Sequence, residues 1–224
     1  MIKILKDLFW KISIKKNKCI VVGSGQFCNF IIQIIEDIQE IDCIGYLSEN
    51  KKKNNIIKNF KCLGDDTYLQ NNKTLYDSVF PAIGNLKIRK KIISKILKNK
   101  KQVTSIKHPS AIQSKTAKFK DSSLMTNSFL SNNVKIGKYS VIGTGSYIHH
   151  DTIIGQNCLI GGGAQIGASV TVEDNVLFGI GSVVASKSIT IGSNSIIAAG
   201  TVVLENIPKN SLVLGNPGRV IKRI

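Results

Sequence analysis

The chain has 224 residues, of which 42% are hydrophobic, and its formal net charge is +17 at pH 7. This length fits one large domain or two small ones, and the apolar fraction suffices for a packed core. The sequence has no uninterrupted apolar stretch of about 18 residues, so no membrane span is expected. A signal peptide is not expected either, because Lys6, Asp7 and Lys11 interrupt the amphipathic start and no small-residue cleavage site follows.

The excess of positive charge is compatible with a nucleic acid, an anionic membrane or an anionic substrate as partner. It also fits a compositional bias, since lysine, asparagine and isoleucine are abundant together along the chain. Arginines are few, and no basic run alternates with aromatic residues, so we expect no nucleic-acid binding. We favour attraction of a negatively charged nucleotide substrate or coenzyme.

The five cysteines argue for a reducing environment. Their number is odd and they show no CxxC spacing, which disfavours both a disulfide framework and a structural zinc site. We therefore expect reduced cysteines in a cytoplasmic protein.

In chain order, an extension over residues 1–17 precedes a segment in which short apolar strands alternate with helices. The extension is basic and amphipathic, and a weak contact with a membrane surface is one role for it. The alternation predicts a small Rossmann-like parallel α/β domain over residues 18–106. We expect strands at 18–23, 42–47, 77–84 and 103–106, and helices at 27–39 and 88–97.

A glycine-containing turn joins the first strand of this domain to the first helix. It reads Gly23-Ser-Gly25-Gln-Phe-Cys28, a truncated dinucleotide fingerprint in which a cysteine takes the place of the third glycine. Backbone N–H groups at such a helix start bind phosphate, and Ser48-Glu49 after the second strand could contact a ribose or a base. A tight turn without a ligand is the alternative. The domain is too short for two mononucleotide-binding halves, so we do not expect a full dinucleotide site.

The second half of the chain has a six-residue repeat. A period of six is incompatible with an α-helix and is typical of short strands separated by corners, as in a parallel β-helix. We expect this β-helix over residues 107–224, with one extra residue inserted near Ser188 and with a C-terminal tail that Pro217 and Gly218 turn away from the last coil. The aliphatic residues predicted to point inward are Leu124, Leu130, Ile136, Ile142, Ile148, Ile154, Ile160, Ile166, Val172, Phe178, Val184, Ile191, Ile197 and Val203.

One repeat carries a candidate for acid–base chemistry. After the inward Ile148, His149 occupies the corner place that glycine usually takes, and His150 should face outward. Histidine titrates near neutrality, and Asp151 could orient the imidazole and stabilise its protonated form. A surface His-His-Asp without a role is the alternative. We expect His108, at the junction of the two halves, to be a hydrogen-bonded structural residue, and the three histidines are not spaced to converge on a metal.

From Lys18 onward the chain resembles the family of sialic-acid O-acetyltransferases and nucleotide-amino-sugar N-acetyltransferases. Single pieces of the match are unspecific, but their ordered combination is specific. The matching segments are VVGSGQ (21–26), IGYLSE (44–49), AIGNLKIRKKI (82–92), IKHPSAI (106–112), IHHDTIIG (148–155), the glycine-rich coils that follow, and LGNPGRVIK (214–222).

This resemblance implies a left-handed β-helix, a homotrimer with active sites between neighbouring β-helices, and acetyl-CoA bound along the later coils. It implies that His150 is the catalytic base and that Asp151 is its acidic partner. It places the coenzyme at Leu159, Gly179, Ile180 and Ala199. It places the nucleotide part of the substrate at Gly25, Gln26, Phe27, Ser48, Glu49, Gly84 and Asn85.

The function expected from the resemblance is acetyl-CoA-dependent N-acetylation of a nucleotide-linked amino-deoxy sugar, for a bacterial surface glycan or glycoprotein. The chain departs from the family pattern at Gln26-Phe27, at Ser48-Glu49 and at Leu159, where members often have Gly-His, Asp-Asp and a second histidine. These departures leave the sugar open. The alternatives are O-acetylation of a sialic acid or capsular sugar, and a non-catalytic trimeric β-helix scaffold.

Overall fold

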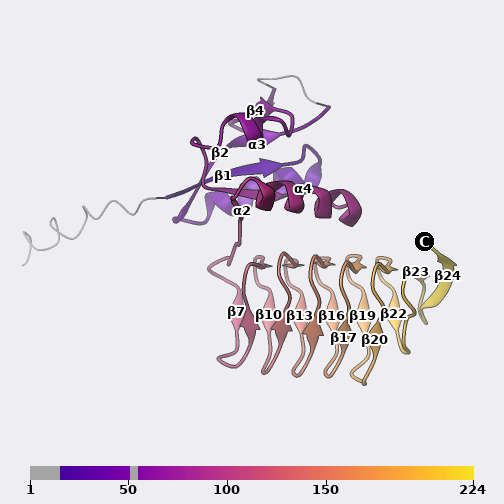
Figure 1. Cartoon of the computed structure of the whole chain (residues 1–224). Coiled ribbons are helices and arrows are strands. Elements are labelled where there is room, and N and C mark those ends of the chain that lie inside the picture. Colours follow the sequence, from indigo (N-terminus) through magenta and orange to yellow (C-terminus); the bar gives the residue numbers. More distant parts are fainter. Residues whose placement is uncertain (1–15, 51–54) are drawn as a thin grey trace, which may run out of the picture.

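The computed structural model describes residues 16–50 and 55–224. The membrane contact considered for residues 1–17 therefore falls almost entirely outside the described residues. An α/β domain lies along one side of a long β-helix, with helices α2 and α4 on the side that faces it (Figure 1). The predicted fold class, a Rossmann-like domain followed by a parallel β-helix, is confirmed.

The α/β domain has one sheet in the strand order β3-β4-β2-β1-β5-β6, parallel except for β3. Both predicted helices and all four predicted strands are present. The short elements β3, β4 and α3 were not predicted from the sequence. The elements are β1 (Asn17–Val22), α2 (Gln26–Glu36), β2 (Ile41–Leu47), β3 (Ile56–Ile57), β4 (Phe60–Gly64), α3 (Tyr68–Asn71), β5 (Ser78–Pro81), α4 (Leu86–Lys98) and β6 (Gln102–Val103).

The central strand β1 is covered on both faces. Its residues Cys19 to Val22 are all buried, as expected for a continuous apolar run in the middle of a parallel sheet. Helix α2 buries its isoleucines on one face, and α3 and α4 cover the other. The strand ends at Gly23, whose φ is +139° and where a Cβ would lie 2.5 Å from the Ala82 carbonyl oxygen. Only glycine fits this turn, which holds the end of β1 against the end of β5.

The β-helix has three flat walls, each a parallel sheet of two-residue strands apart from the last two strands of the third wall. The β13 wall comprises β7 (Ile112–Gln113), β10 (Phe129–Leu130), β13 (Tyr147–Ile148), β16 (Gln165–Ile166), β19 (Val183–Val184) and β22 (Val202–Val203). The β14 wall comprises β8 (Lys118–Phe119), β11 (Lys135–Ile136), β14 (Ile153–Ile154), β17 (Thr171–Val172) and β20 (Thr190–Ile191). The β15 wall comprises β9 (Ser123–Leu124), β12 (Val141–Ile142), β15 (Leu159–Ile160), β18 (Leu177–Phe178), β21 (Ile196–Ile197), β23 (Ser211–Leu214) and β24 (Arg219–Arg223).

The inward positions predicted from the six-residue period are confirmed. Each of the aliphatic residues from Leu124 to Val203 in that series is buried, with at most 7% of its surface exposed. The extra residue near Ser188 is also confirmed, because Thr171 pairs with Thr190 at a spacing one residue longer than Ile153 with Thr171.

Both ends of the β-helix differ from the prediction. Two strands, β7 and β8, precede Leu124, and there the six-residue phase is broken: Gln113 aligns with Leu130, while Ile112 faces outward and is 60% exposed. At the other end, the tail does not turn away from the last coil. Strand β23 adds to β21, and β24 folds back antiparallel onto β23.

The two domains are joined by a buried polar contact as well as by apolar packing. Arg89 of α4 is 1% exposed; its Nε donates to the Pro81 carbonyl at 3.2 Å and its guanidinium to Asn157 Oδ1 at 2.5 Å. Burial lowers the pKa of Arg89 to about 10. Asn157 in turn donates to the Leu86 carbonyl, at the start of α4. At the chain crossing, His108 lies 2.7 Å from Ser110 Oγ and 3.5 Å from the Asp37 carboxylate, in keeping with its expected structural role.

Replacing Arg89 should weaken this junction. In Arg89→Ala, the carbonyl of Pro81 and the side chain of Asn157 lose a buried donor, and a cavity remains between the domains. We expect the free energy of unfolding to fall by about 2–4 kcal/mol, measured by urea titration followed by circular dichroism. The exposed Lys98→Ala on the same helix is the control. A decrease in the free energy of unfolding of less than about 0.5 kcal/mol, as is usual at surface sites, would contradict the role of Arg89 in joining the two domains.

Candidate functional site

The corner between the β13 wall and the β14 wall, called here the His150 corner, presents a histidine and an aspartate to solvent. His150 Nδ1 lies 2.8 Å from Asp151 Oδ2, and the two side chains are 57% and 51% exposed. Asp151 adopts a left-handed backbone (φ +59°), and its N–H donates to the Asn132 carbonyl one coil earlier. Because the carboxylate accepts at Nδ1, Nδ1 carries the proton and Nε2 keeps a free lone pair. The outward orientation expected for His150 is present.

Asn133 is a residue that the sequence reading missed. Its Nδ2 donates to Asp151 Oδ1 at 2.9 Å, so both carboxylate oxygens of Asp151 have a partner. The hydrogen bond from His150, and then that from Asn133, lower the pKa of Asp151 below its usual value. The spacing of 18 residues between Asn133 and Asp151 is three hexads, one full coil, and is the signal that could have paired them.

The Asn133 contact predicts a measurable shift. In Asn133→Ala the pKa of Asp151 should rise part of the way to its ordinary value, because the bond from His150 remains. A carboxyl whose pKa is lowered by folding favours the folded state above its ordinary pKa, and this advantage disappears as the pH falls through the lowered value. Carbon-13 NMR titration of the carboxyl groups measures the shift. Asn132→Ala is the control, since Asn132 contacts Asp151 only through its backbone; an unchanged Asp151 in Asn133→Ala would contradict the role.

The corner between the β15 wall and the β13 wall, called here the Ile180 corner, collects three of the four predicted coenzyme residues. Ile180 is 72% exposed, and its carbonyl accepts from Gly200, the neighbour of the exposed Ala199 on the next coil. A Cβ on Gly179 would lie 2.2 Å from the Ala199 nitrogen, so successive coils are in close contact here. The fourth residue, Leu159, is not at this corner: it lies on the β15 wall, half-buried against the α/β domain.

The predicted nucleotide residues all follow three adjacent parallel strands, β2, β1 and β5, and therefore lie along one edge of the sheet. Such carboxyl edges are where α/β sheets bind ligands. Around Gly25 and Gly84 an added Cβ would have no neighbour within 4 Å, so both turns are open to a ligand. The members of this edge set are Gly25, Gln26, Phe27, Ser48, Glu49, Gly84 and Asn85.

Some side chains of this edge already have structural contacts. The Asn85 carboxamide oxygen caps α4 by accepting from the N–H groups of Lys87 and Ile88. The Phe27 ring packs edge-on against Phe80, and Ser48 is 8% exposed with its Oγ accepting from the Asn50 N–H. Glu49 and Gln26 are exposed.

A cavity of about 650 Å³ connects this edge to the β-helix. One side is the start of α4, including Gly84 and Asn85, and the floor is Leu177 and Ile196 on the β15 wall. Asn175 and Asn194 extend the lining to the corner between the β14 wall and the β15 wall, and none of the coenzyme candidates lines this cavity. The remaining lining residues are Leu86, Lys87, Lys90, Lys91, Ser94 and Ile224.

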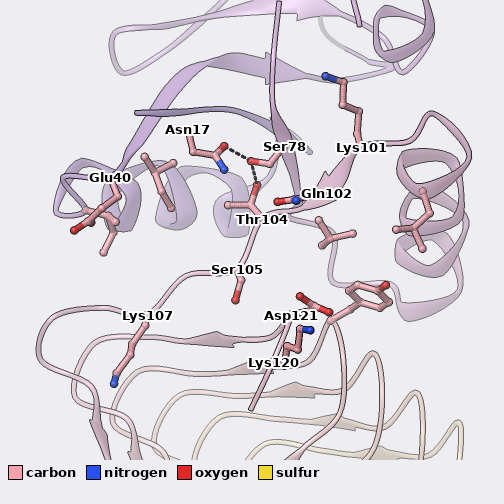
Figure 2. A pocket seen from close by; sticks show the side chains of 15 residues that line it. Asn17, Glu40, Ser78, Lys101, Gln102, Thr104, Ser105, Lys107, Lys120 and Asp121 are labelled. Carbon is pink, nitrogen blue, oxygen red and sulfur yellow. Dashed lines mark hydrogen bonds between the residues drawn. The ribbon is translucent and has the colours of Figure 1, made fainter. Parts of the chain in front are cut away.

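A second cavity, of about 790 Å³, lies elsewhere. It sits between the amino edge of the sheet and the first coil, around a chain of hydrogen bonds from Thr104 through Ser78 to Asn17 (Figure 2). None of the sequence-predicted site residues lines it. It is larger than the cavity at α4 but lies at the opposite edge from the glycine turns, so we do not take it as the site.

One chain does not assemble all of these parts. The α/β domain packs on the β15 wall, through Val141 and Leu159, and on the corner at Asn157. In a three-walled prism, the corner opposite the β15 wall is the His150 corner. The nucleotide edge and the cavity thus lie at the β15 wall, whereas His150 and Asp151 lie across the β-helix from the α/β domain of the same chain.

Residues 16–50 and 55–224 bring together no group of three or more His, Cys, Asp or Glu side chains that could hold a metal ion. Within the same ranges no helix has the length and apolar character needed to span a membrane.

Two family models match the chain. The PglD N-terminal domain matches residues 18–96, and the hexapeptide repeat of succinyl-transferase matches residues 151–171 and 169–205. Among curated proteins, a putative acetyltransferase from Saccharomyces cerevisiae is 48% identical over 44 residues, and the galactoside O-acetyltransferase of Escherichia coli is 50% identical over 46. These matches span only about a fifth of the chain, and 22% and 23% of the two relatives.

Solved structures match nearly the whole chain. Perosamine N-acetyltransferase from Caulobacter crescentus, in complex with CoA and GDP-perosamine, superposes with a TM-score of 0.84 at 22% identity, covering 92% of this chain and 97% of that one. The acetyltransferase domain of PglB from Neisseria gonorrhoeae gives 0.84 at 21% identity, covering 92% and 100%. At this identity the likeness establishes the fold, including the left-handed β-helix. The chain thus combines a match to the PglD N-terminal domain with a match to the hexapeptide repeat, on the fold of these solved acetyltransferases.

Proposed function

We propose that the protein is an acetyl-CoA-dependent N-acetyltransferase acting on the amino group of a nucleotide-linked amino-deoxy sugar, used for a bacterial surface glycan or glycoprotein. The observation that carries the proposal is the outward His150–Asp151 pair, whose Nε2 is left free to accept a proton. The likeness to enzymes solved with CoA and GDP-perosamine, or with acetyl-CoA, supports both substrates. In this proposal residues 18–106 bind the nucleotide sugar, residues 107–224 are the acyltransferase domain, and residues 1–17 are an extension.

The geometry suits direct transfer. His150 Nε2 takes a proton from the sugar amine as the nitrogen forms a bond with the thioester carbonyl carbon. Asp151 holds the imidazole at Nδ1 and stabilises the imidazolium that results. The carbon–sulfur bond then breaks, and the proton on Nε2 neutralises the departing thiolate, so that amide and thiol are the products. General-base help of this kind is worth about 10²–10⁴ in rate.

The residues present fit acetyl-CoA as the donor. The Ile180 corner exposes Ile180 and Ala199 on two successive coils, with the half-buried Gly179 packed between them, which leaves this surface open to a thin extended chain. Ile180 and Ala199 lie less than two and less than three coils beyond His150, about 8 and 13 Å along the axis at the usual strand spacing. A donor lying along this corner would bring its thioester to the level of His150. Leu159, on the wall, would contact it only from the side.

We propose a homotrimer as the working form, with the β13 wall at its centre. The outward side chains of that wall are Ile112, Phe129, Tyr147, Gln165, Val183 and Val202, mostly apolar, whereas the β14 wall presents Lys118, Lys135, Ile153, Thr171 and Thr190. In a threefold arrangement around the β13 walls, the two corners of each wall meet different neighbours. The His150 corner of one chain then adjoins the Ile180 corner of the next, and with it that chain's cavity and α/β domain.

A cytoplasmic location belongs to the same proposal. All five cysteines are buried and the structure forms no disulfide among them, which fits a reducing compartment. The substrates proposed, a coenzyme A thioester and an activated sugar, are cytoplasmic metabolites.

A thiol-release assay tests the function. Acetyl-CoA is supplied with a panel of nucleotide-linked amino-deoxy sugars and of free sialic acids. Turnover of a nucleotide-linked amino sugar supports the proposal and names the substrate. Turnover with free sugars alone would move the function to O-acetylation. If no sugar in the panel is acetylated and calorimetry detects no coenzyme binding, the alternative of a non-catalytic trimeric scaffold would be favoured.

A further inference from the structure

The cavity at the start of α4 carries a charge pattern that the glycine turns do not explain. Lys87, Lys90 and Lys91 line it from one face of the helix, at spacings of three and four residues. Among the described residues that line the cavity there is no aspartate or glutamate. The cavity is therefore a concave site with one sign of charge on one side and aliphatic side chains on the floor.

These three lysines differ from others on the same helix. Lys95, one turn further, pairs with Asp66 at 2.8 Å, whereas in the described part of the chain the cavity lysines form no ion pair. Like charges at spacings of three and four on a helix repel each other. A bound anion would relieve this repulsion, and the apolar floor would favour an anion attached to a flat or hydrophobic group.

We infer that this cavity binds the diphosphate of a nucleotide, with Lys87, Lys90 and Lys91 contacting the phosphates and Leu177 and Ile196 packing against the attached group. The inference rests on the proposed function, because both substrates of the proposed transfer carry a nucleoside diphosphate. On one side the cavity is lined by Gly84 and Asn85 of the nucleotide edge, and on the other by Leu177 and Ile196, which belong to the strands that precede Ile180 and Ala199. The nucleotide sugar and the coenzyme are thus the two sources of that diphosphate.

The test is calorimetric titration of the full-length protein with UDP, with GDP, with uridine and with CoA, at two salt concentrations. The double variant Lys87→Ala/Lys91→Ala is compared with Lys98→Ala/Lys100→Ala, which removes the same charge at the last residue of α4 and just after the helix, outside the cavity lining. We expect the cavity variant to lose about tenfold or more in affinity for a nucleoside diphosphate or CoA, with a weaker salt dependence. Uridine, which lacks phosphate, should be unaffected.

The separate titrations with UDP, GDP and CoA distinguish the two sources of the diphosphate. A loss confined to UDP or GDP assigns the cavity to the acceptor, and a loss confined to CoA assigns it to the donor; both support a diphosphate site. Unchanged affinity for all nucleotides in the cavity variant, or no nucleotide binding by the wild type, would overturn it. Binding that depends on the lysines in a protein without transferase activity would remove the proposed function alone. Acetyl transfer with unaltered KM values in the cavity variant would remove this inference alone.

Discussion

His150→Ala should lose about 10²–10⁴ in kcat while keeping the fold and the oligomeric state. The imidazole is exposed and packs against no core residue, so its removal leaves no buried cavity. Among the described residues its one side-chain partner is Asp151, itself exposed, so the corner should keep its backbone bonds to the coils on either side. The thiol-release assay gives kcat and KM, and light scattering and circular dichroism report assembly and fold.

The neighbouring histidine is the matched control. His149 occupies the same corner, but its ring packs against that of Tyr147, with the centroids 4.4 Å apart and the planes tilted by 43°. We expect His149→Ala to change kcat far less than His150→Ala does. An equal loss in the two variants would show that the corner matters as a structure and not through a base at His150. An unfolded His150→Ala would likewise make its role structural.

Most of the β-helix could be predicted from the sequence because each coil repeats the same physical requirement. A residue such as Ile166 must be aliphatic to fill the prism, and this requirement returns every six residues. The prediction of inward positions fails at the first coil, where the interior is open at one end and an apolar residue is no longer required. At the open first coil, Gln113 can take an inward-aligned place, and the phase slips without a sequence signal.

The site was only partly predictable for a different reason. His150 and Asp151 are adjacent in the sequence, so their pairing needs no knowledge of the fold. Asn133 contacts Asp151 only because coils stack 18 residues apart, and Arg89 contacts Asn157 across 68 residues. The Arg89–Asn157 contact depends on how the two domains dock, and no local sequence pattern specifies that docking.

Within one chain, His150 and the α/β domain lie on opposite sides of the β-helix. This placement predicts a large gain in activity when two inactive variants are combined. If each site combines the His150 corner of one subunit with the Ile180 corner of the next, two inactive variants should restore each other. His150→Ala removes the base, and Ala199→Trp places a bulky ring on the exposed surface proposed for the donor. Each alone should be inactive. In a random equal mixture, about a quarter of the interfaces pair an intact histidine with an intact corner, so about a quarter of wild-type activity should return.

Coexpression is needed for this experiment, because the chains must mix before they assemble. The control mixes the two purified variants after assembly, where little activity is expected if subunits do not exchange. Mixed trimers without activity would show that each site draws His150 and the Ile180 corner from one chain, although the fold puts them at different corners of the prism. A monomer in solution would overturn the shared site altogether, since His150 would then have no second wall to form a groove with.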